Sequence, residues 1–115
     1  MITDEDIIQE FITIFTKLYP SIGPILHQCH VRIIHSSWGN PPKDLQYISI
    51  YCSENLVSIV QEHLDALRDI AQNIGLSEVV CINASRLVRD PLSKIRWSSP
   101  RLWLELHWLI SKNRL

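Results

Sequence analysis

Hydrophobic positions follow a helical period near the start of the chain. Between residues 4 and 19 the large apolar side chains fall on one arc at 100° per residue, with polar side chains opposite. Thr3 is a suitable N-cap, acids occupy the first turn where the helix is partially positive, and Pro20 ends the period. The pattern predicts an amphipathic helix near 4–19, followed by at most a short helical turn at 25–28.

The period then changes from helical to alternating. The runs "VRIIHSSW" and "DLQYISIYC" are rich in β-prone residues, and "GNPPK" between them contains prolines that lack the amide donor a ladder needs. We expect a hairpin of two strands, Val31–Ser37 and Leu45–Cys52. The later run "SEVVCINAS" predicts a third strand, Val79–Asn83.

A strong helical pattern separates the second and third strands. Ser53 is placed as an N-cap, an apolar stripe continues through residues 54–74, and Gly75 provides a C-terminal stop. We therefore predict one long helix near 54–74, which would form a right-handed crossover. His63 falls within its apolar arc and is expected to be partly buried.

The C-terminal segment predicts a last helix with two apolar faces. Residues 86–99 read as irregular or weakly helical, interrupted by Pro91, and Pro100 stands at a first-turn position. Leu104 and Trp108 lie roughly opposite a larger stripe that would dock on the domain. That docking stripe consists of Leu102, Trp103, Leu106, Leu109 and Ile110.

The element order α-β-β-α-β-α indicates a two-layer α+β fold. We expect one domain over residues 1–115, with a small three-stranded sheet packed on helices and a Trp-rich C-terminal helix. A chain of 115 residues with 46% hydrophobic and 20% charged residues buries enough surface to fold without disulfides or metals.

Several features predict a soluble, cytoplasmic protein. The N-terminal residues are acidic where a signal peptide is basic, and no apolar run is long enough to span a bilayer. The three cysteines are odd in number and far apart in the sequence, within apolar stretches. We interpret Cys29, Cys52 and Cys81 as reduced thiols that serve as small buried hydrophobes.

The stretch "HQCHVRIIH" raises the hypothesis of a metal site, because it holds three histidines and a cysteine. Paired zinc ligands usually come as CxxC or HxxxH, and neither a suitable spacing nor a second cluster is present. We therefore predict no metal ligands and no cofactor, and interpret His27, Cys29, His30 and His35 as loop or strand-edge residues.

A second candidate for chemistry is a Cys/His pair. His63 would approach His35 and Cys52 if those strand positions face the helix, and a neighbouring imidazole lowers a thiol pKa. The simpler interpretation is that His63 donates one hydrogen bond to a backbone carbonyl. No glycine-rich phosphate loop, Gly-x-Ser-x-Gly elbow or His-Glu-x-x-His motif is present. We predict no catalytic residues and no enzyme.

Charge is distributed unevenly along the chain. Residues 1–85 carry four basic and ten acidic residues, a net charge of −6, whereas residues 86–115 carry seven basic and two acidic residues, a net charge of +5. The basic segment "SRLVRDPLSKIRW" predicts either packing of a basic tail on an acidic body or contact with phosphates. The candidate phosphate-binding residues are Arg86, Arg89 and Lys94.

The leading functional hypothesis is a non-catalytic protein-interaction module, a small adaptor or assembly factor that binds another protein or a second copy of itself. Its partner surface would be the C-terminal segment, with a sheet edge as a second candidate part, unless both stripes of the last helix are buried within the domain. The alternative is a nucleic-acid-associated protein using residues 86–101, and the third is a small Cys/His enzyme or metal protein. The predicted partner-binding residues are Leu104, Trp108, Trp97, Arg96 and Arg101.

Overall fold

The computed structural model describes residues 2–90 and 94–112 and contains the predicted α+β order of elements. The predicted interruption at Pro91 lies outside the described residues. Three short helical segments, η1, α4 and α5, accompany the predicted elements, and the long helix is divided into two. In chain order the elements are α1 (Asp4–Leu18), η1 (Gly23–Gln28), β1 (His30–Trp38), β2 (Lys43–Cys52), α2 (Glu54–Glu62), α3 (Leu64–Asn73), β3 (Val79–Asn83), α4 (Ala84–Arg89), α5 (Ile95–Ser98) and α6 (Pro100–Lys112).

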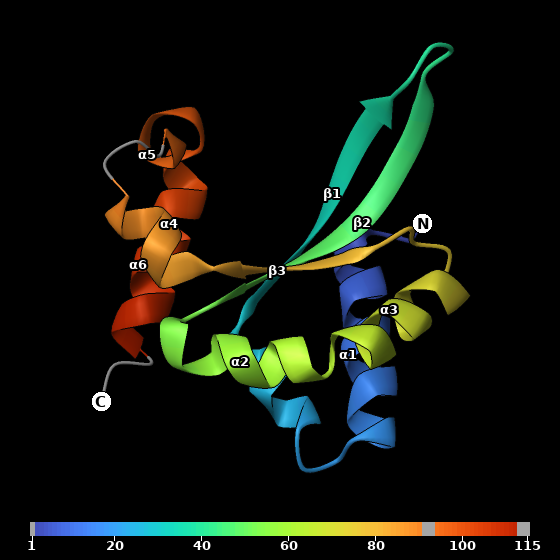
Figure 1. Cartoon of the computed structure of the whole chain (residues 1–115), viewed down its shortest axis with the longest axis horizontal. Coiled ribbons are helices and arrows are strands. Elements are labelled where there is room, and N and C mark those ends of the chain that lie inside the picture. The colour runs from blue at the N-terminus through green and yellow to red at the C-terminus, as the bar shows by residue number, and fades with distance from the viewer. Residues whose placement is uncertain (1, 91–93, 113–115) are drawn as a thin grey trace.

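The three predicted strands form one mixed sheet in the order β1-β2-β3. The β1–β2 hairpin is antiparallel and pairs His30 with Tyr51, whereas β2 and β3 are parallel and pair Ile50 with Cys81. The hairpin tip projects away from the helices (Figure 1), and the first residues of β2 are exposed there. Because β1 is an edge strand, half of its backbone polar groups point away from β2.

Helix α1 begins as the sequence predicts. The Thr3 hydroxyl accepts a hydrogen bond from the Asp6 amide, and the Asp6 carboxylate accepts one from the Thr3 amide, which together form a capping box. Leu18 departs from the predicted arc, because its position at the last turn leaves it 61% exposed. The buried face of α1 consists of Ile8, Phe11, Ile12 and Phe15.

The prediction of one continuous helix over residues 54–74 is wrong at its middle, because the helix is interrupted at His63. This residue ends α2 and precedes α3 with φ −105° and ψ 12°. Its ring Nδ1 donates to the Ile59 carbonyl at 3.0 Å, the group that its own backbone amide would bond in an uninterrupted helix. The ring also meets the rings of Phe15 and Tyr19 edge-on. The expected hydrogen bond from His63 to a backbone carbonyl is therefore present.

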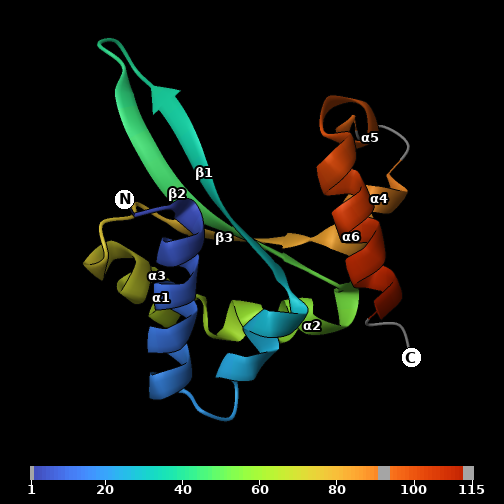
Figure 2. The same cartoon turned by 180° about the vertical axis from the view of Figure 1, so that it is seen from behind.

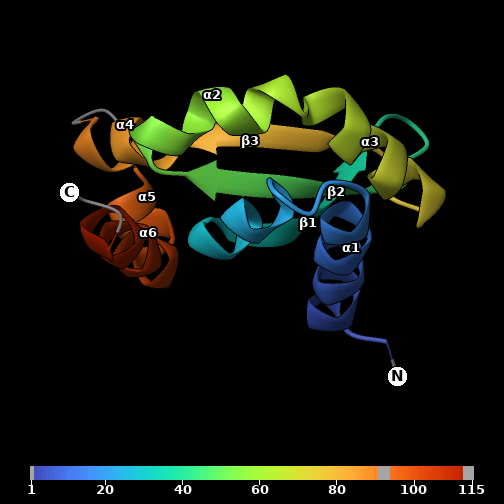
Figure 3. The same cartoon turned by 90° about the horizontal axis from the view of Figure 1, so that it is seen from below.

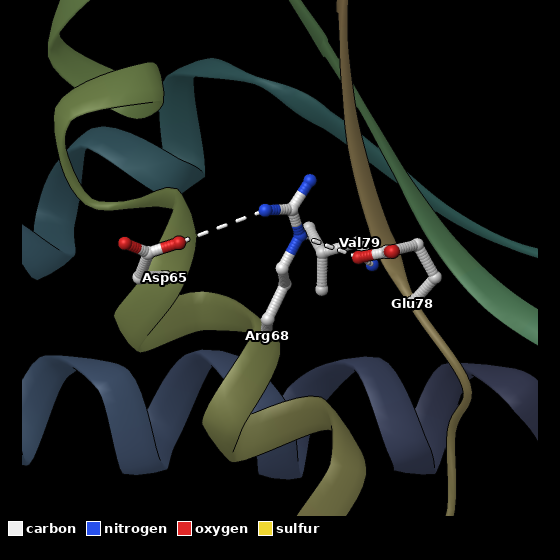
Figure 4. A network of polar contacts seen from close by, with 4 residues as sticks. All are labelled: Asp65, Arg68, Glu78 and Val79. Atoms are coloured by element: carbon white, nitrogen blue, oxygen red, sulfur yellow. Dashed lines mark hydrogen bonds and ion pairs between the residues drawn. The ribbon is translucent and has the colours of Figure 1, made fainter.

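Polar contacts join α3 to the start of β3. The Arg68 guanidinium bonds the Glu78 carboxylate and lies 3.6 Å from that of Asp65, and the Val79 amide donates to Glu78 at 2.9 Å (Figure 4). The Val79 amide and then the Arg68 side chain lower the pKa of Glu78. Gly75 ends the α3 region with a φ of +92°, as its predicted role as a stop requires.

The two faces of β2 enter two different hydrophobic clusters. Ile48, Ile50 and Cys52 pack in the main core with α1, η1, α2 and α3, whereas Tyr51 packs with Ala84 and α6. Helices α1 and α6 are separate from one another in the views from behind and from below, with α3 at the end of the molecule away from α6 (Figures 2 and 3). Among the described residues, no helix is both long and apolar enough to cross a membrane.

Candidate functional site

Helix α6 presents an apolar face to the domain and a second apolar face to solvent. Leu102, Leu106 and Leu109 are buried against the cluster that contains Tyr51 and Ala84, as predicted for the docking stripe. Leu104 and Trp108, four residues apart on the other face, are 60% and 65% exposed. The alternative that both stripes are buried within the domain is therefore wrong.

A pocket of about 430 Å³ lies against this exposed face. One wall belongs to α6, and the other belongs to the end of η1 and the start of β1. Trp108 and Leu104 therefore stand beside a hollow and not on a flat surface. The lining residues are His27, Cys29, His30, Leu104, Glu105, Trp108 and Leu109.

His30 and Glu105 join the two walls of the pocket. Nε2 of His30 lies 3.2 Å from a carboxylate oxygen of Glu105, but this buried nitrogen has no partner in hydrogen-bond geometry among the described residues. Burial lowers the pKa of His30, and the Glu105 carboxylate opposes that shift. The pair is therefore an electrostatic contact without a hydrogen bond. The His30 ring also lies 5.9 Å from the ring of Tyr51, which ties the pocket wall to the second cluster.

A larger groove of about 570 Å³ begins on the same two residues. It follows the edge of β1 that has no neighbouring strand, from His30 to Ile33, between the first turns of α1 and α6. Arg101, one of the predicted partner-binding residues, lines this groove, and its Nε lies 3.5 Å from the Glu105 carboxylate. The positive charge of Arg101 therefore lies beside the negative charge of Glu105 within the groove.

The predicted phosphate-binding arginines lie beside acidic side chains. Arg86 and Arg89 line a hollow of about 370 Å³ together with Glu54 and Asp90. An Arg89 guanidinium nitrogen lies 3.9 Å from the Glu54 carboxylate. Lys94 is exposed at the start of α5. This mixture of charges fits packing of a basic tail on an acidic body better than it fits a phosphate site, which needs a positive surface.

Arg96 and Trp97 lie on α5, on a different helix from Leu104 and Trp108. The Arg96 guanidinium carbon is 5.4 Å from the ring centroid of Trp97 and 5.2 Å from that of Trp103, both within cation–π range. Trp97 itself is 79% exposed. These two predicted residues line neither the pocket nor the groove.

The residues of the Cys/His hypothesis are not brought together. His35 contacts the Asp4 carboxylate at 2.9 Å, His63 bonds the Ile59 carbonyl, and Cys52 contacts other cysteines. Within residues 2–90 and 94–112, no group of three or more histidine, cysteine or acidic side chains is arranged to hold a metal ion. Of "HQCHVRIIH", His27, Cys29 and His30 instead form a pocket wall.

The three cysteines, which the sequence suggested were separate hydrophobes, are in contact. The sulfur of Cys52 lies 3.6 Å from that of Cys29 and 3.7 Å from that of Cys81. Cys52 is fully buried, and the two outer cysteines are half-buried. The cluster is adjacent to the pocket, since Cys29 lines it.

Sequence reasoning identified the exposed face of α6 but missed the opposite wall. The apolar residues of α6 repeat at helical spacing, so their two faces follow from the sequence alone. His30 and Glu105 are separated by most of the chain, and no local pattern predicts that they meet. The density of histidine and cysteine near residue 30 was the available signal, although it suggested a metal.

Comparison with known proteins adds no family to this description. No family model matches the chain, and neither the curated proteins nor the solved structures contain a significant match.

Proposed function

We propose that this protein is a non-catalytic interaction module, a small adaptor that binds a partner protein through the exposed face of α6. The observation that carries the proposal is the exposure of Leu104 and Trp108 beside a pocket of about 430 Å³. A tryptophan buries on the order of 200 Å² when covered, and aromatic side chains beside pockets dominate binding energy in protein interfaces.

The partner we propose is a second copy of the chain. A two-fold interface is self-complementary, so it needs an anchor and a pocket that receives it within one surface patch. Trp108 and Leu104 meet this condition, because they themselves line the pocket. In such a dimer Trp108 of each protomer would fill the pocket of the other. Because the patch is small, we expect a dissociation constant on the order of micromolar.

Sedimentation equilibrium tests this arrangement. The wild-type protein should be a reversible dimer at roughly 100 µM and mostly monomeric at about 0.1 µM, as a micromolar constant requires. The double variant Leu104→Ser, Trp108→Ala should stay monomeric over the whole range. Its melting temperature, measured at a concentration where both proteins are monomeric, should remain within a few degrees because exposed side chains contribute little to folding.

Leu18→Ser is the matched control. Leu18 is 61% exposed, close to the exposure of Leu104, but it lies at the end of α1 and lines neither the pocket nor the groove. This control variant should dimerise like the wild type. A monomeric wild type, a dimer that survives the double substitution, or loss of the dimer in Leu18→Ser would each contradict the proposal.

A further inference from the structure

Three cysteines from separate parts of the chain meet on one face of the sheet. Cys29 follows η1, Cys52 ends β2, and Cys81 lies in the middle of β3. The Cys52 sulfur stands between the other two, at 3.6 Å from Cys29 and 3.7 Å from Cys81. Cys52 is therefore the shared neighbour of both outer thiols.

The sheet register places these thiols where a disulfide can form. His30 pairs with Tyr51 in the antiparallel ladder, so Cys29 and Cys52 are the next opposite pair. Opposite residues have Cα atoms about 4.5–5.5 Å apart, within the roughly 4.4–6.8 Å range that disulfides span. Cys81 pairs with Ile50 in the parallel ladder, which makes Cys52 its diagonal neighbour on the same face. For the opposite pair Cys29 and Cys52, rotation of the side chains without movement of a strand would bring the sulfur atoms together. Diagonal neighbours are about 7–8 Å apart, so a disulfide between Cys52 and Cys81 would also require a small shift of a strand.

The central thiol differs from both outer thiols in access and from Cys81 in acidity. Cys29 lines the pocket beside Trp108, and Cys81 is also half-buried, so small reagents reach these two before the fully buried Cys52. Hydrogen bonds with Cys29 and Cys81, and then burial, raise the pKa of Cys52. The hydrogen bond from Cys52 lowers the pKa of Cys81. Access therefore makes both outer cysteines the sites of first attack, and the lowered pKa of Cys81 adds to this because peroxides react with thiolates.

We infer that the cluster is a peroxide-sensitive modification site in which Cys52 is the resolving thiol. An outer sulfur attacks one oxygen of hydrogen peroxide, the O–O bond breaks, and a sulfenic acid and water form. The Cys52 sulfur then attacks the sulfenic sulfur, the S–O bond breaks, and the departing hydroxide takes the Cys52 proton to form a second water. Two thiols are oxidised by two electrons in total, and one peroxide is reduced to two waters.

Titration of the reduced protein with hydrogen peroxide tests the inference, at a concentration where the protein is monomeric, so that the Trp108 of a second copy does not cover Cys29. Wild-type protein should lose two of its three free thiols, with a mass decrease of about 2 Da that dithiothreitol reverses. Peptide mapping after alkylation should find a disulfide that contains Cys52, joined to either Cys29 or Cys81. A disulfide between Cys29 and Cys81, disulfides between molecules, or stable oxygen adducts without a disulfide would each overturn the proposal.

Single variants test whether Cys52 is specifically required for the disulfide, or whether any two neighbouring thiols are sufficient. In Cys52→Ala no internal disulfide should form, and sulfenic acid trapped by dimedone should rise several-fold. Cys29→Ala and Cys81→Ala are the matched controls, because each retains Cys52 with one neighbour and should still form a disulfide. A Cys52→Ala protein that forms an internal disulfide at the wild-type rate would contradict the assignment. If Cys52→Ala does not fold by circular dichroism, the wild-type peptide map decides the question.

Discussion

At the scale of single residues, His30 connects the candidate site to the stability of the fold. Its ring is largely removed from water between β1 and α6, where Glu105 offers an electrostatic contact. Burial lowers its pKa from the ordinary value of 6.5 because the charged form loses hydration. The unfolded chain therefore binds a proton at a higher pH than the folded chain does, and protonation favours unfolding.

This linkage predicts a pH dependence of stability. The free energy of unfolding should be highest above pH 6.5 and should fall as the pH decreases from 6.5 through the lowered pKa of His30. In His30→Gln this part of the decline should be absent, so the melting temperature should change by a few degrees less than in wild type between pH 7.5 and 5.5. In Glu105→Gln, which removes the opposing carboxylate, the decline should become steeper. Thermal denaturation of the wild type and the two variants across this pH range measures the melting temperatures. The same pH dependence in His30→Gln as in wild type would refute the linkage.

At the scale of elements, the close approach of η1 to α1 depends on one missing side chain. A Cβ added to Gly23 would lie 2.4 Å from the Cα of Thr16, so the backbone itself leaves no space. The Thr16 hydroxyl, which bonds the Ile12 carbonyl at 2.7 Å, is also in the way. This approach holds Leu26 of η1 in the main core and leads the chain into β1, where the pocket wall begins.

We therefore expect Gly23→Ala to separate η1 from α1 and to reduce the free energy of unfolding by about 1–3 kcal/mol, the usual cost of overpacking. Ser21→Ala is the control, because Ser21 is exposed in the same connection and should change stability by less than about 0.5 kcal/mol. Urea denaturation of the two variants and wild type gives the comparison. If Gly23→Ala were as stable as wild type, the approach of Gly23 to Thr16 would have room for a methyl group, contrary to this prediction.

At the scale of the whole molecule, several of the described basic side chains of the C-terminal segment lie beside acidic or aromatic side chains. Arg89 pairs with Glu54, Arg101 lies beside Glu105, and Arg96 lies over tryptophan rings. The face proposed for association is instead apolar around Leu104 and Trp108. The interaction hypothesis uses this apolar face, whereas the nucleic-acid alternative uses the basic side chains. Salt distinguishes the two hypotheses, because phosphate binding weakens steeply as the salt concentration rises and apolar association does not.

Salt titration tests this distinction. Between about 50 and 500 mM NaCl the dimer dissociation constant should change by less than roughly threefold, as expected for burial of apolar surface. A fluorescent single-stranded oligonucleotide should show no saturable binding at low micromolar protein in 50 mM salt. The nucleic-acid alternative would be favoured over the adaptor if the protein bound the oligonucleotide tightly and the double variant Arg86→Gln, Arg89→Gln did not.

Local patterns in the sequence predicted most of the elements, because their causes lie within a few residues. Thr3 and Asp6 close a capping box within one turn, Gly75 supplies the positive φ at a helix end, and strand alternation predicted the hairpin. The separation of Leu104 and Trp108 from the docking stripe of α6 followed from the angle of 100° per residue. These features need no knowledge of distant residues.

Tertiary structure alone decided which distant groups became neighbours. His63 breaks the predicted long helix, with its ring bonded to Ile59 and packed beside α1, and periodicity does not encode that choice. The meeting of the three cysteines depends on the register of both ladders, and a slip of one residue would turn Cys52 to the other face of the sheet. The pocket that His30 and Glu105 line exists because α6 docks beside the start of β1. The burial of Leu106 against the Tyr51 face of the sheet determines that docking position.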